Sequence, residues 1–273
     1  LDFLNLRPGG TYIDATFGGG GHSRAILEAL GSKGRLIAFD QDPDAGANAL
    51  DDSRFTLVPH NFEHLKRFLK LHGAPQVDGI LADLGVSSHQ LDQPERGFAH
   101  KYEGPLDMRM NPAKGIAASK WLERVTPAEL AEILRENSDE PHAQILAPQL
   151  AAKSISSTLE LAQAIRTALS SRPEEELKKT VARVFQAIRI EVNEEFAALD
   201  ALLRSLPFSL RLGGRVAILT FHSGEDRRVK KAFQAGHREG IYSEIARDVI
   251  RSSAAECRAN PRATSAKLRW ARR

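Results

Sequence analysis

The feature that most constrains this chain is a run of four glycines, Gly18–Gly21, between a strand pattern and a helix pattern. The β-branched segment Thr11–Thr16 precedes the run, and the helical segment His22–Leu30, closed by Gly31, follows it. Glycines in such a turn let a ligand approach the backbone closely, as in the nucleotide-binding α/β folds. The sequence therefore predicts a ligand-binding loop here, with a tight turn that only packs helix on strand as the alternative.

Three further short apolar runs alternate with helical patterns in the first third of the chain. The expected strands are Arg35–Asp40, Phe55–His60 and Asp78–Leu84, and the expected helices are Pro43–Leu50 and Phe62–Leu71. Short apolar strands separated by helices are typical of a parallel sheet that is covered on both faces. We therefore expect an α/β fold with a doubly wound, Rossmann-like sheet.

Strand signals stop after Gly85 and return only at Arg215–Phe221. Between them, a capping box over Ser157–Glu160 opens one predicted helix, and apolar residues recur at helical spacing over Val181–Leu206. Two unrelated domains in series would leave the last strand without a sheet, so a helical insertion is the simpler interpretation. The expected domains are a discontinuous sheet domain, residues 1–110 and 207–273, and an inserted all-helical domain, residues 111–206.

The amino-acid composition indicates the cellular location of the protein but not its activity. Hydrophobic residues make up 42% of the 273 residues and charged residues 27%, as in ordinary globular proteins. No apolar run approaches the roughly 20 residues that span a bilayer, and the first residues do not resemble a signal peptide. The single Cys257 excludes an intramolecular disulfide and fits a reducing compartment. We expect a cytoplasmic protein with no membrane partner, and the sequence does not indicate an oligomeric state.

The net charge of +3 is unevenly distributed. Residues Arg251–Arg273 include seven basic side chains and one acidic side chain, Glu256. A basic tail of this kind suits a polyanionic partner. The alternative is a solvated last strand and helix.

The residues around the glycine run narrow the choice of ligand. A nucleoside triphosphate loop needs Lys followed by Ser or Thr after its last glycine, whereas this chain has His22 and Ser23. Gly18 and Gly20 match the first two positions of the dinucleotide fingerprint, but its third glycine would fall on Ser23. Asp40, after the second expected strand, can bind a ribose, which both NAD and S-adenosylmethionine present.

The fourth expected strand favours the methyl donor. The carboxyl ends of parallel strands form one edge, so we expect Asp14, Asp40, Asp83 and the turn after Phe221 to converge there. A carboxylate at Asp83 suits a positively charged sulfonium and an acceptor amine that must lose positive charge. A hydride transferase has no such need, so an NAD-dependent oxidoreductase is the less favoured alternative.

Several motifs together resemble one family. They are FGGGGHS, DGILADLGVSSHQLD, ERGF, GPLDMRM, FQAIRIEVNEE, FHSGEDR and NPRATSAKLR. From Leu6 to Arg273 the chain resembles the MraW/RsmH family. The resemblance implies a class I methyltransferase fold with an inserted helical domain. It also implies S-adenosylmethionine-dependent methylation of cytosine N4 in the decoding region of 16S ribosomal RNA, with the small ribosomal subunit as partner.

The resemblance also implies which residues contact the cofactor. They are Gly20, Gly21, His22, Asp40, Phe62, Asp83 and Gln90. The chain departs from the family at Gly224, where Leu is usual and where we expect a looser turn. It departs again over Asp139–Lys153, where the aromatic and basic pattern is missing and Pro148 is expected to break the helix.

Methyl transfer to cytosine N4 needs positioning and charge dispersal, because the nitrogen lone pair is delocalised into the ring. Asp83, with the carbonyls of Leu84 and Gly85, is the candidate catalytic group that would accept hydrogen bonds from the amino group. Methylation at C5 normally needs a cysteine nucleophile beside the base, but Cys257 lies in the basic tail.

Further candidates for RNA or substrate contact are Arg109, Arg189, His222 and Ser223. For the two arginines a structural ion pair is an equal alternative, and for Ser223 the alternative is a helix N-cap with Asp226 three residues on. The histidines around residues 60–64 have ligand spacing without a third ligand, so we predict no metal site. A catalytically silent RNA-binding protein is the remaining alternative function.

Overall fold

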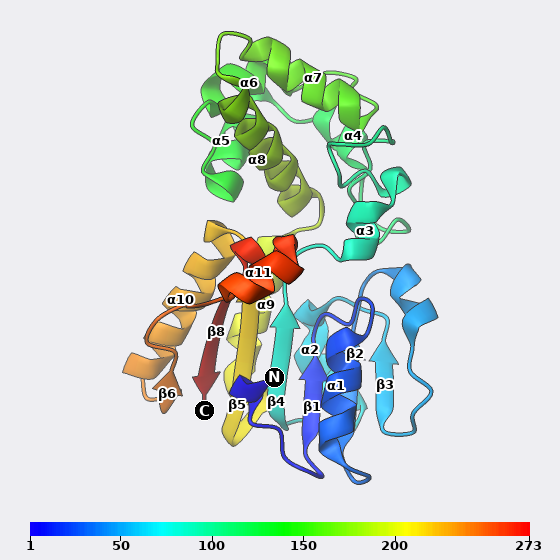
Figure 1. Cartoon of the computed structure of the whole chain (residues 1–273), viewed down its shortest axis with the longest axis vertical. Helices are drawn as coiled ribbons and strands as arrows, with labels where there is room; N and C mark the ends of the chain where they lie inside the picture. The colour runs from blue at the N-terminus through cyan, green and yellow to red at the C-terminus, as the bar shows by residue number, and fades with distance from the viewer. The chain divides into compact units, whose positions relative to one another are not determined.

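The computed structural model describes all residues 1–273, which form two compact units (Figure 1). The sheet unit comprises Leu1–Gly85 and Phe196–Arg273, and the helical unit comprises Val86–Glu195. Both boundaries lie earlier in the chain than the expected boundaries at residues 110 and 206. The reason is packing, because Phe98 and Leu106 are buried in the core of the helical unit, whereas Leu199 is buried against the sheet.

The sheet has the strand order β3-β2-β1-β4-β5-β8-β6, with β7 paired to β8. Strands β1 to β5 are parallel to their neighbours, and β8 runs antiparallel. The expected doubly wound α/β sheet is therefore confirmed. The strands are β1 Thr11–Asp14, β2 Arg35–Phe39, β3 Phe55–Val58, β4 Val77–Asp83, β5 Leu210–Thr220, β6 Glu244–Ile245, β7 Ile250–Arg251 and β8 Lys267–Arg272.

Helices cover both faces of this sheet, which explains why its strands are continuously apolar. Helix α1 (Gly21–Leu30) packs on one face, where Tyr12 and Leu36 point. Helices α2, α9 and α10 pack on the other face, where Ile13 and Ile37 point (Figure 1). Their bounds are α2 Leu65–Leu71, α9 Glu195–Ser209 and α10 Ser223–Arg238. A short helix, α11 Ala254–Ala259, precedes the last strand.

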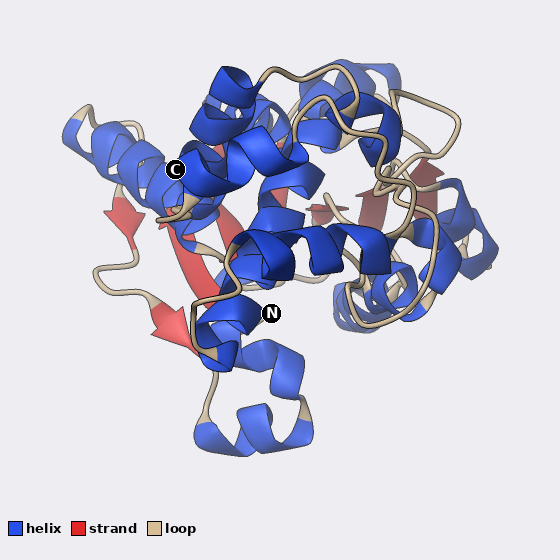
Figure 2. Cartoon of the chain, turned by 90° about the horizontal axis from the view of Figure 1, so that it is seen from above, coloured by secondary structure: helices blue, strands red, loops and turns tan.

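Strands occur only in the sheet unit (Figure 2), and the helical unit is built on its own apolar core. Its longest helix, α8, contributes Val181, Val184 and Ile188 to that core. The helices of this unit are α3 Ser88–Asp92, α4 Ala118–Leu122, α5 Pro127–Ser138, α6 Ala143–Leu150, α7 Thr158–Ala168 and α8 Glu174–Val192. Only half of the predicted capping box of α7 is formed: Ser157 Oγ accepts the Glu160 N–H at 3.2 Å, but the Glu160 carboxylate accepts the Ser156 N–H at 2.7 Å.

Some local expectations need correction. The segment expected as a helix over residues 43–50 is a 3₁₀ helix, Pro43–Asn48, and another 3₁₀ turn precedes α2. Pro148 does not break α6, because it lies in the last turn and removes only one backbone hydrogen bond there. The helical spacing over Val181–Leu206 belongs to two helices, separated at Glu194 by a left-handed backbone with φ 51°.

None of the helices is both long enough and apolar enough to cross a membrane.

The close contact between β4 and β1 yields a test of the fold. A Cβ at Gly79 would lie 2.7 Å from Cδ1 of Tyr12, whose side chain is 1% exposed. We expect Gly79→Ala to lower the free energy of unfolding by about 1–3 kcal/mol through overpacking. The matched control is Gly46→Ala, since Gly46 is exposed and a Cβ there meets nothing within 4 Å. Urea unfolding of both variants measures the difference, and equal stabilities would contradict the packing.

Candidate active site

Three carboxylates lie at the carboxyl edge of the parallel strands. Asp14 ends β1, Asp83 ends β4 and Asp40 directly follows β2. The register pairs Asp14 with Leu81 on β4 and with Ala38 on β2, so Asp83 and Asp40 each lie two residues beyond the level of Asp14, at the same edge. The expected convergence of Asp14, Asp40 and Asp83 on one edge is therefore confirmed.

Asp14 is the buried anchor of this edge. Its side chain is fully buried and accepts two hydrogen bonds, from the Ser23 hydroxyl at 2.7 Å and from the Thr16 N–H at 3.2 Å. Burial raises the pKa of Asp14 to about 6, and the two hydrogen bonds offset only part of that rise. Thr16 in turn accepts the Asp83 N–H on its hydroxyl oxygen at 2.7 Å, which ties the glycine loop to the end of β4.

One carboxylate oxygen of Asp83 is hydrogen-bonded, and the other oxygen is not. Oδ2 lies 3.2 Å from Nε2 of His22, and this hydrogen bond is the main reason that the pKa of His22 is raised. Oδ1 is buried and has no hydrogen-bond partner. A buried acceptor without a partner costs free energy, and in native proteins it usually marks a place where a ligand or water supplies the donor.

The glycine loop is open on the side away from the core. Gly18 and Gly20 have left-handed backbones with φ of 51° and 76°, which side chains rarely adopt. A Cβ at Gly19 or Gly21 would meet nothing within 4 Å. Gly20 is the N-cap of α1 and makes no side-chain capping hydrogen bond, so the first backbone N–H groups of that helix have no side-chain acceptor from the cap. The loop can therefore accept a ligand directly on its backbone.

Asp40 is more constrained than the sequence suggested. Its Oδ2 accepts the Gly18 N–H at 2.7 Å and its Oδ1 accepts the Asp42 N–H at 2.9 Å. Burial raises the pKa of Asp40, and these backbone hydrogen bonds counteract the rise. Because each carboxylate oxygen has a second lone pair, the group can hold the loop and still accept a hydroxyl. Phe62 starts the 3₁₀ turn after β3 and packs, partly buried, against the core beside α2.

Gln90, another expected cofactor contact, has a structural role within the helical unit. Its side-chain oxygen accepts the Ser87 N–H at 3.0 Å, and the Ser87 hydroxyl accepts the Gln90 N–H at 3.2 Å. These two bonds form a capping box at the start of α3. The sequence carries the signal for this cap, because Ser and Gln stand three residues apart there.

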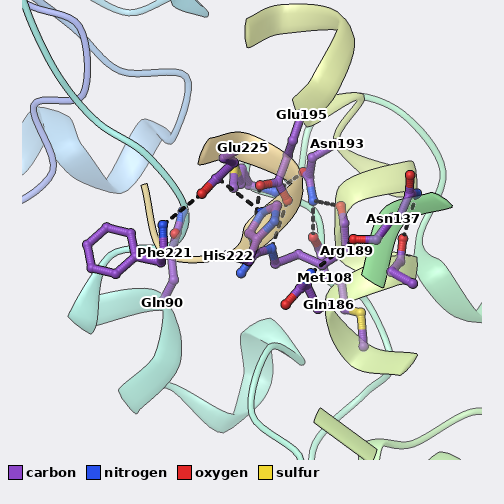
Figure 3. Close-up of polar contacts among 12 residues, drawn as sticks. Gln90, Met108, Asn137, Gln186, Arg189, Asn193, Glu195, Phe221, His222 and Glu225 are labelled. Atoms are coloured by element: carbon purple, nitrogen blue, oxygen red, sulfur yellow. Dashed lines mark hydrogen bonds and ion pairs between the residues drawn. The ribbon is translucent and has the colours of Figure 1, made fainter. Parts of the chain in front are cut away.

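Both candidate arginines are held in two-point ion pairs. Arg109 binds the carboxylate of Asp107 at 2.9 and 2.7 Å, and Arg189 binds Glu195 at 2.8 and 3.0 Å (Figure 3). The structural alternative for each arginine is thus present. Such pairs fix the guanidinium plane, which leaves it preorganised for any further contact.

The loop that carries Arg109 is fixed by a residue that the sequence did not single out. Asn193 donates from Nδ2 to the Met108 carbonyl at 2.7 Å and accepts the Met110 N–H on Oδ1 at 2.7 Å (Figure 3). Buried Arg96 donates to the Met110 carbonyl at 2.9 Å. Together these contacts hold Met108 in a left-handed conformation with φ 60°.

The turn after β5 differs from the expected arrangement. Helix α10 begins at Ser223, and His222 is its N-cap, so Ser223 is not the capping residue. Glu225 is 3% exposed and was missed; its Oε2 accepts the Phe221 N–H at 2.9 Å, and its Oε1 lies 3.2 Å from Nε2 of His222 (Figure 3). Asp226 binds buried Arg269 at 2.6 Å, which makes that tail residue structural.

Gly224 does not loosen this turn. A Cβ there would lie 2.6 Å from the ring of Phe196, so glycine allows the ring to pack directly on the backbone. Arg228 stacks its guanidinium on the same ring at 3.8 Å from the centroid. The expected loose turn is therefore wrong, because the absent side chain is replaced by an aromatic ring.

The comparisons with known proteins identify the family of this chain. The sequence profile of the MraW methylase family matches residues 1–273. The chain belongs to this family. The resemblance inferred from the motifs is thereby confirmed over the whole length of the chain.

Several relatives are similar along nearly the whole chain. A protein of Agathobacter rectalis named ribosomal RNA small subunit methyltransferase H 1 is 46% identical, with 99% of this chain and 82% of that protein covered. A protein of Porphyromonas gingivalis named ribosomal RNA small subunit methyltransferase H is 44% identical, with 99% and 93% covered. A crystal structure of an rRNA methylase from Streptococcus thermophilus aligns with a TM-score of 0.44 at 13% identity, covering 100% and 92%.

No group of three or more His, Cys, Asp or Glu side chains is arranged to hold a metal ion.

The raised pKa of Asp14 predicts a pH dependence of stability. In the folded protein the pKa is about 6, above the ordinary value of 3.8, so the folded state binds this proton more tightly. The free energy of unfolding therefore falls as the pH rises through this window. Asn at this position cannot titrate, so we expect the wild type to lose about 2 kcal/mol more than Asp14→Asn between about pH 4.5 and 7.

Urea unfolding at several pH values measures this difference. Asn keeps one oxygen, which can accept the Thr16 N–H, and its NH2 can donate to the Ser23 hydroxyl, so the variant removes the titrating charge while both side-chain contacts can form. Parallel pH profiles for the two proteins would contradict the buried, protonatable state of Asp14.

Proposed function

We propose that this protein transfers a methyl group from S-adenosylmethionine to N4 of a cytidine in the decoding region of 16S ribosomal RNA. Membership of the MraW methylase family supports the methyl transfer, and the names of its relatives support the small-subunit RNA as substrate. The proposed substrate form is the small ribosomal subunit, and the proposed place of action is the cytoplasm.

The carboxyl edge of the sheet fits this cofactor. The open glycine loop, the uncapped start of α1 and the acidic Asp40 suit the aminoacyl and ribose parts of a nucleoside derivative. When bound, S-adenosylmethionine supplies a methyl group attached to a positively charged sulfur. The residues of the sheet unit that would hold it are Gly20, Gly21, His22, Asp40, Phe62 and Asp83.

The observation that carries the proposal is the buried Oδ1 of Asp83, which has no hydrogen-bond partner. An amino group of cytosine has N–H donors to offer it. Accepting such a hydrogen bond would localise the nitrogen lone pair and disperse the positive charge that develops on N4. His22 binds the other oxygen of Asp83 at 3.2 Å and so orients the carboxylate. We therefore assign Asp83 the catalytic role.

The contacts of Asp83 favour N4 over C5 as the methylated atom. The single cysteine, Cys257, lies in α11, and the hydrogen bonds of Asp83 at the end of β4 are made with His22 and Thr16. Methylation at C5 would need a thiolate beside the base. Methylation at N4 needs only a positioned acceptor.

RNA contacts are proposed for two groups of residues. In the tail, Arg251, Arg258 and Arg262 are exposed, in contrast to the buried Arg269. These side chains would give phosphate affinity that weakens with salt. In the second group we keep Arg109, Arg189, His222 and Ser223 as contacts to the substrate RNA.

The decisive experiment supplies radiolabelled S-adenosylmethionine to small ribosomal subunits that lack the modification, followed by nucleoside mass spectrometry of the RNA. The proposal predicts label in N4-methylcytidine at one site. Label in C5-methylcytidine or in no nucleoside would contradict it, and the latter would favour a catalytically silent RNA-binding protein. Calorimetric titration with NADH in place of the methyl donor tests the oxidoreductase alternative, and we expect no binding.

Replacing Asp83 tests its assigned role. Asp83→Asn should lower kcat about a hundredfold at saturating cofactor, because the charge that stabilises the developing cation is lost. The control is Asp51→Asn, which removes an equal charge at an exposed position. Single-turnover kinetics and calorimetric cofactor affinity separate the two effects. Weaker cofactor binding with normal kcat at saturation would reduce Asp83 to a cofactor contact.

A further inference from the structure

A basic surface on the sheet unit lies apart from the carboxyl edge that holds the candidate site. It consists of Lys66, Arg67 and Lys70 on α2 together with Arg204 and Phe208 on α9, and we call it the α2–α9 ridge. Both helices pack on the same face of the sheet (Figure 1). We infer that the α2–α9 ridge is a second RNA-binding surface, which takes the sugar-phosphate backbone and one unstacked base of the substrate RNA.

The cations of the ridge are exposed and have no acidic partner. Lys66, Arg67, Lys70 and Arg204 are all exposed, and none of them forms an ion pair. The nearest acid in sequence, Glu63, lies 3.4 Å from His64. By contrast, many other surface cations of this chain are paired, as Lys120 is with Glu123 and Lys179 is with Glu175. The ridge therefore presents uncompensated positive charge.

Phe208 adds a stacking surface to this charge. Its side chain is 60% exposed, which is unusual for an aromatic residue of this size. Nζ of Lys66 lies 4.4 Å from the ring centroid, so a cation and the exposed ring are in contact on this surface. An exposed aromatic ring beside several cations is the combination that binds single-stranded or unstacked RNA.

A hollow of about 650 Å³ extends the ridge along α2. It is lined by Glu63, His64, Lys66, Arg67, Lys70 and Leu71. Three of these side chains are cationic and one is anionic, so the hollow suits an anionic ligand. The charge selects a polyanion over an apolar partner, although Leu71 is also exposed.

The Phe208 end of the ridge is far from Asp83 within the sheet unit. Phe208 comes just before β5, whose first residue Leu210 pairs with the first residue of β4, Val77. Asp83 is at the other end of β4, on the order of 20 Å away at 3.3 Å per residue. A base stacked on Phe208 is therefore a different nucleotide from the target cytidine. This inference rests on the proposed function, because the RNA is the substrate of that reaction.

The test compares two triple variants of the full chain in binding to unmodified small ribosomal subunits at several salt concentrations. Lys66→Gln with Arg67→Gln and Lys70→Gln removes the ridge charges. The control, Lys33→Gln with Lys231→Gln and Arg238→Gln, removes equal charge from exposed positions elsewhere in the sheet unit.

The ridge variant should bind at least tenfold more weakly, and its slope of log affinity against log salt should fall by about 2 to 3. The control should change affinity less than threefold. Equal losses in the two variants, or no loss in the ridge variant, would overturn the inference.

Phe208 is tested separately from the charges. Phe208→Ala should weaken binding about tenfold through lost stacking, and Phe208→Tyr should restore it to within about twofold. Cofactor affinity and thermal unfolding of every variant should match the wild type. Binding that still depends on the ridge after ribonuclease digestion of the subunit would mean an acidic protein partner and would also overturn the inference.

The outcomes distinguish this inference from the proposed function. If RNA binding depends on the ridge but no N4-methylcytidine forms, the proposed reaction is wrong and the proposed RNA-binding surface stands. If methylation is normal but the affinity for the ribosomal subunit does not depend on the ridge, the proposed RNA-binding surface is wrong and the proposed reaction stands.

Discussion

The parallel pairing of β1 with β2 and β4 is the constraint on which the candidate site depends. It directs the carboxyl ends of three strands to the same side of the sheet, so Asp14, Asp40 and Asp83 share one edge although they are far apart in sequence. A one-residue slip of β4 would turn Asp83 to the opposite face. The hydrogen bond from the Asp83 N–H to Thr16 Oγ1 at 2.7 Å fixes that register next to the glycine loop. The positions of the three carboxylates, and so the ligands that they can bind, therefore depend on these strand pairings and on this hydrogen bond.

The acidic side chains at this edge lie in different environments. Asp14 is fully buried, so its pKa is raised and it serves the loop through Ser23 and Thr16. Asp83 lies nearer to the surface, is paired with His22 and keeps one oxygen without a partner. Carboxylates whose surroundings differ in this way can take different roles, one structural and one chemical. Gly224, where the family usually has Leu, lies in the turn after β5, and the ring of Phe196 occupies the space of the missing side chain. This difference from the family does not affect the roles of Asp14 and Asp83.

The sequence predicted the parts of the fold that follow from periodicity and from the parallel-sheet rule. Strands β1 to β5, the helix after the glycine loop and the shared edge of Asp40 and Asp83 are of this kind. The inward role of Glu225 was not predictable, because an acidic residue in the first turn of a helix is equally common on the surface. The domain limits were missed for a similar reason, since apolar residues such as Leu106 and Leu199 do not show which core they join.

The most direct test of the central claim is a crystal structure of the protein with S-adenosylhomocysteine and cytidine bound. The account predicts the cofactor product along the glycine loop, with the cytidine amino nitrogen about 2.7–3.2 Å from Oδ1 of Asp83. A cytidine bound with its amino group away from Asp83, or a cofactor product at the other end of the strands, would contradict it.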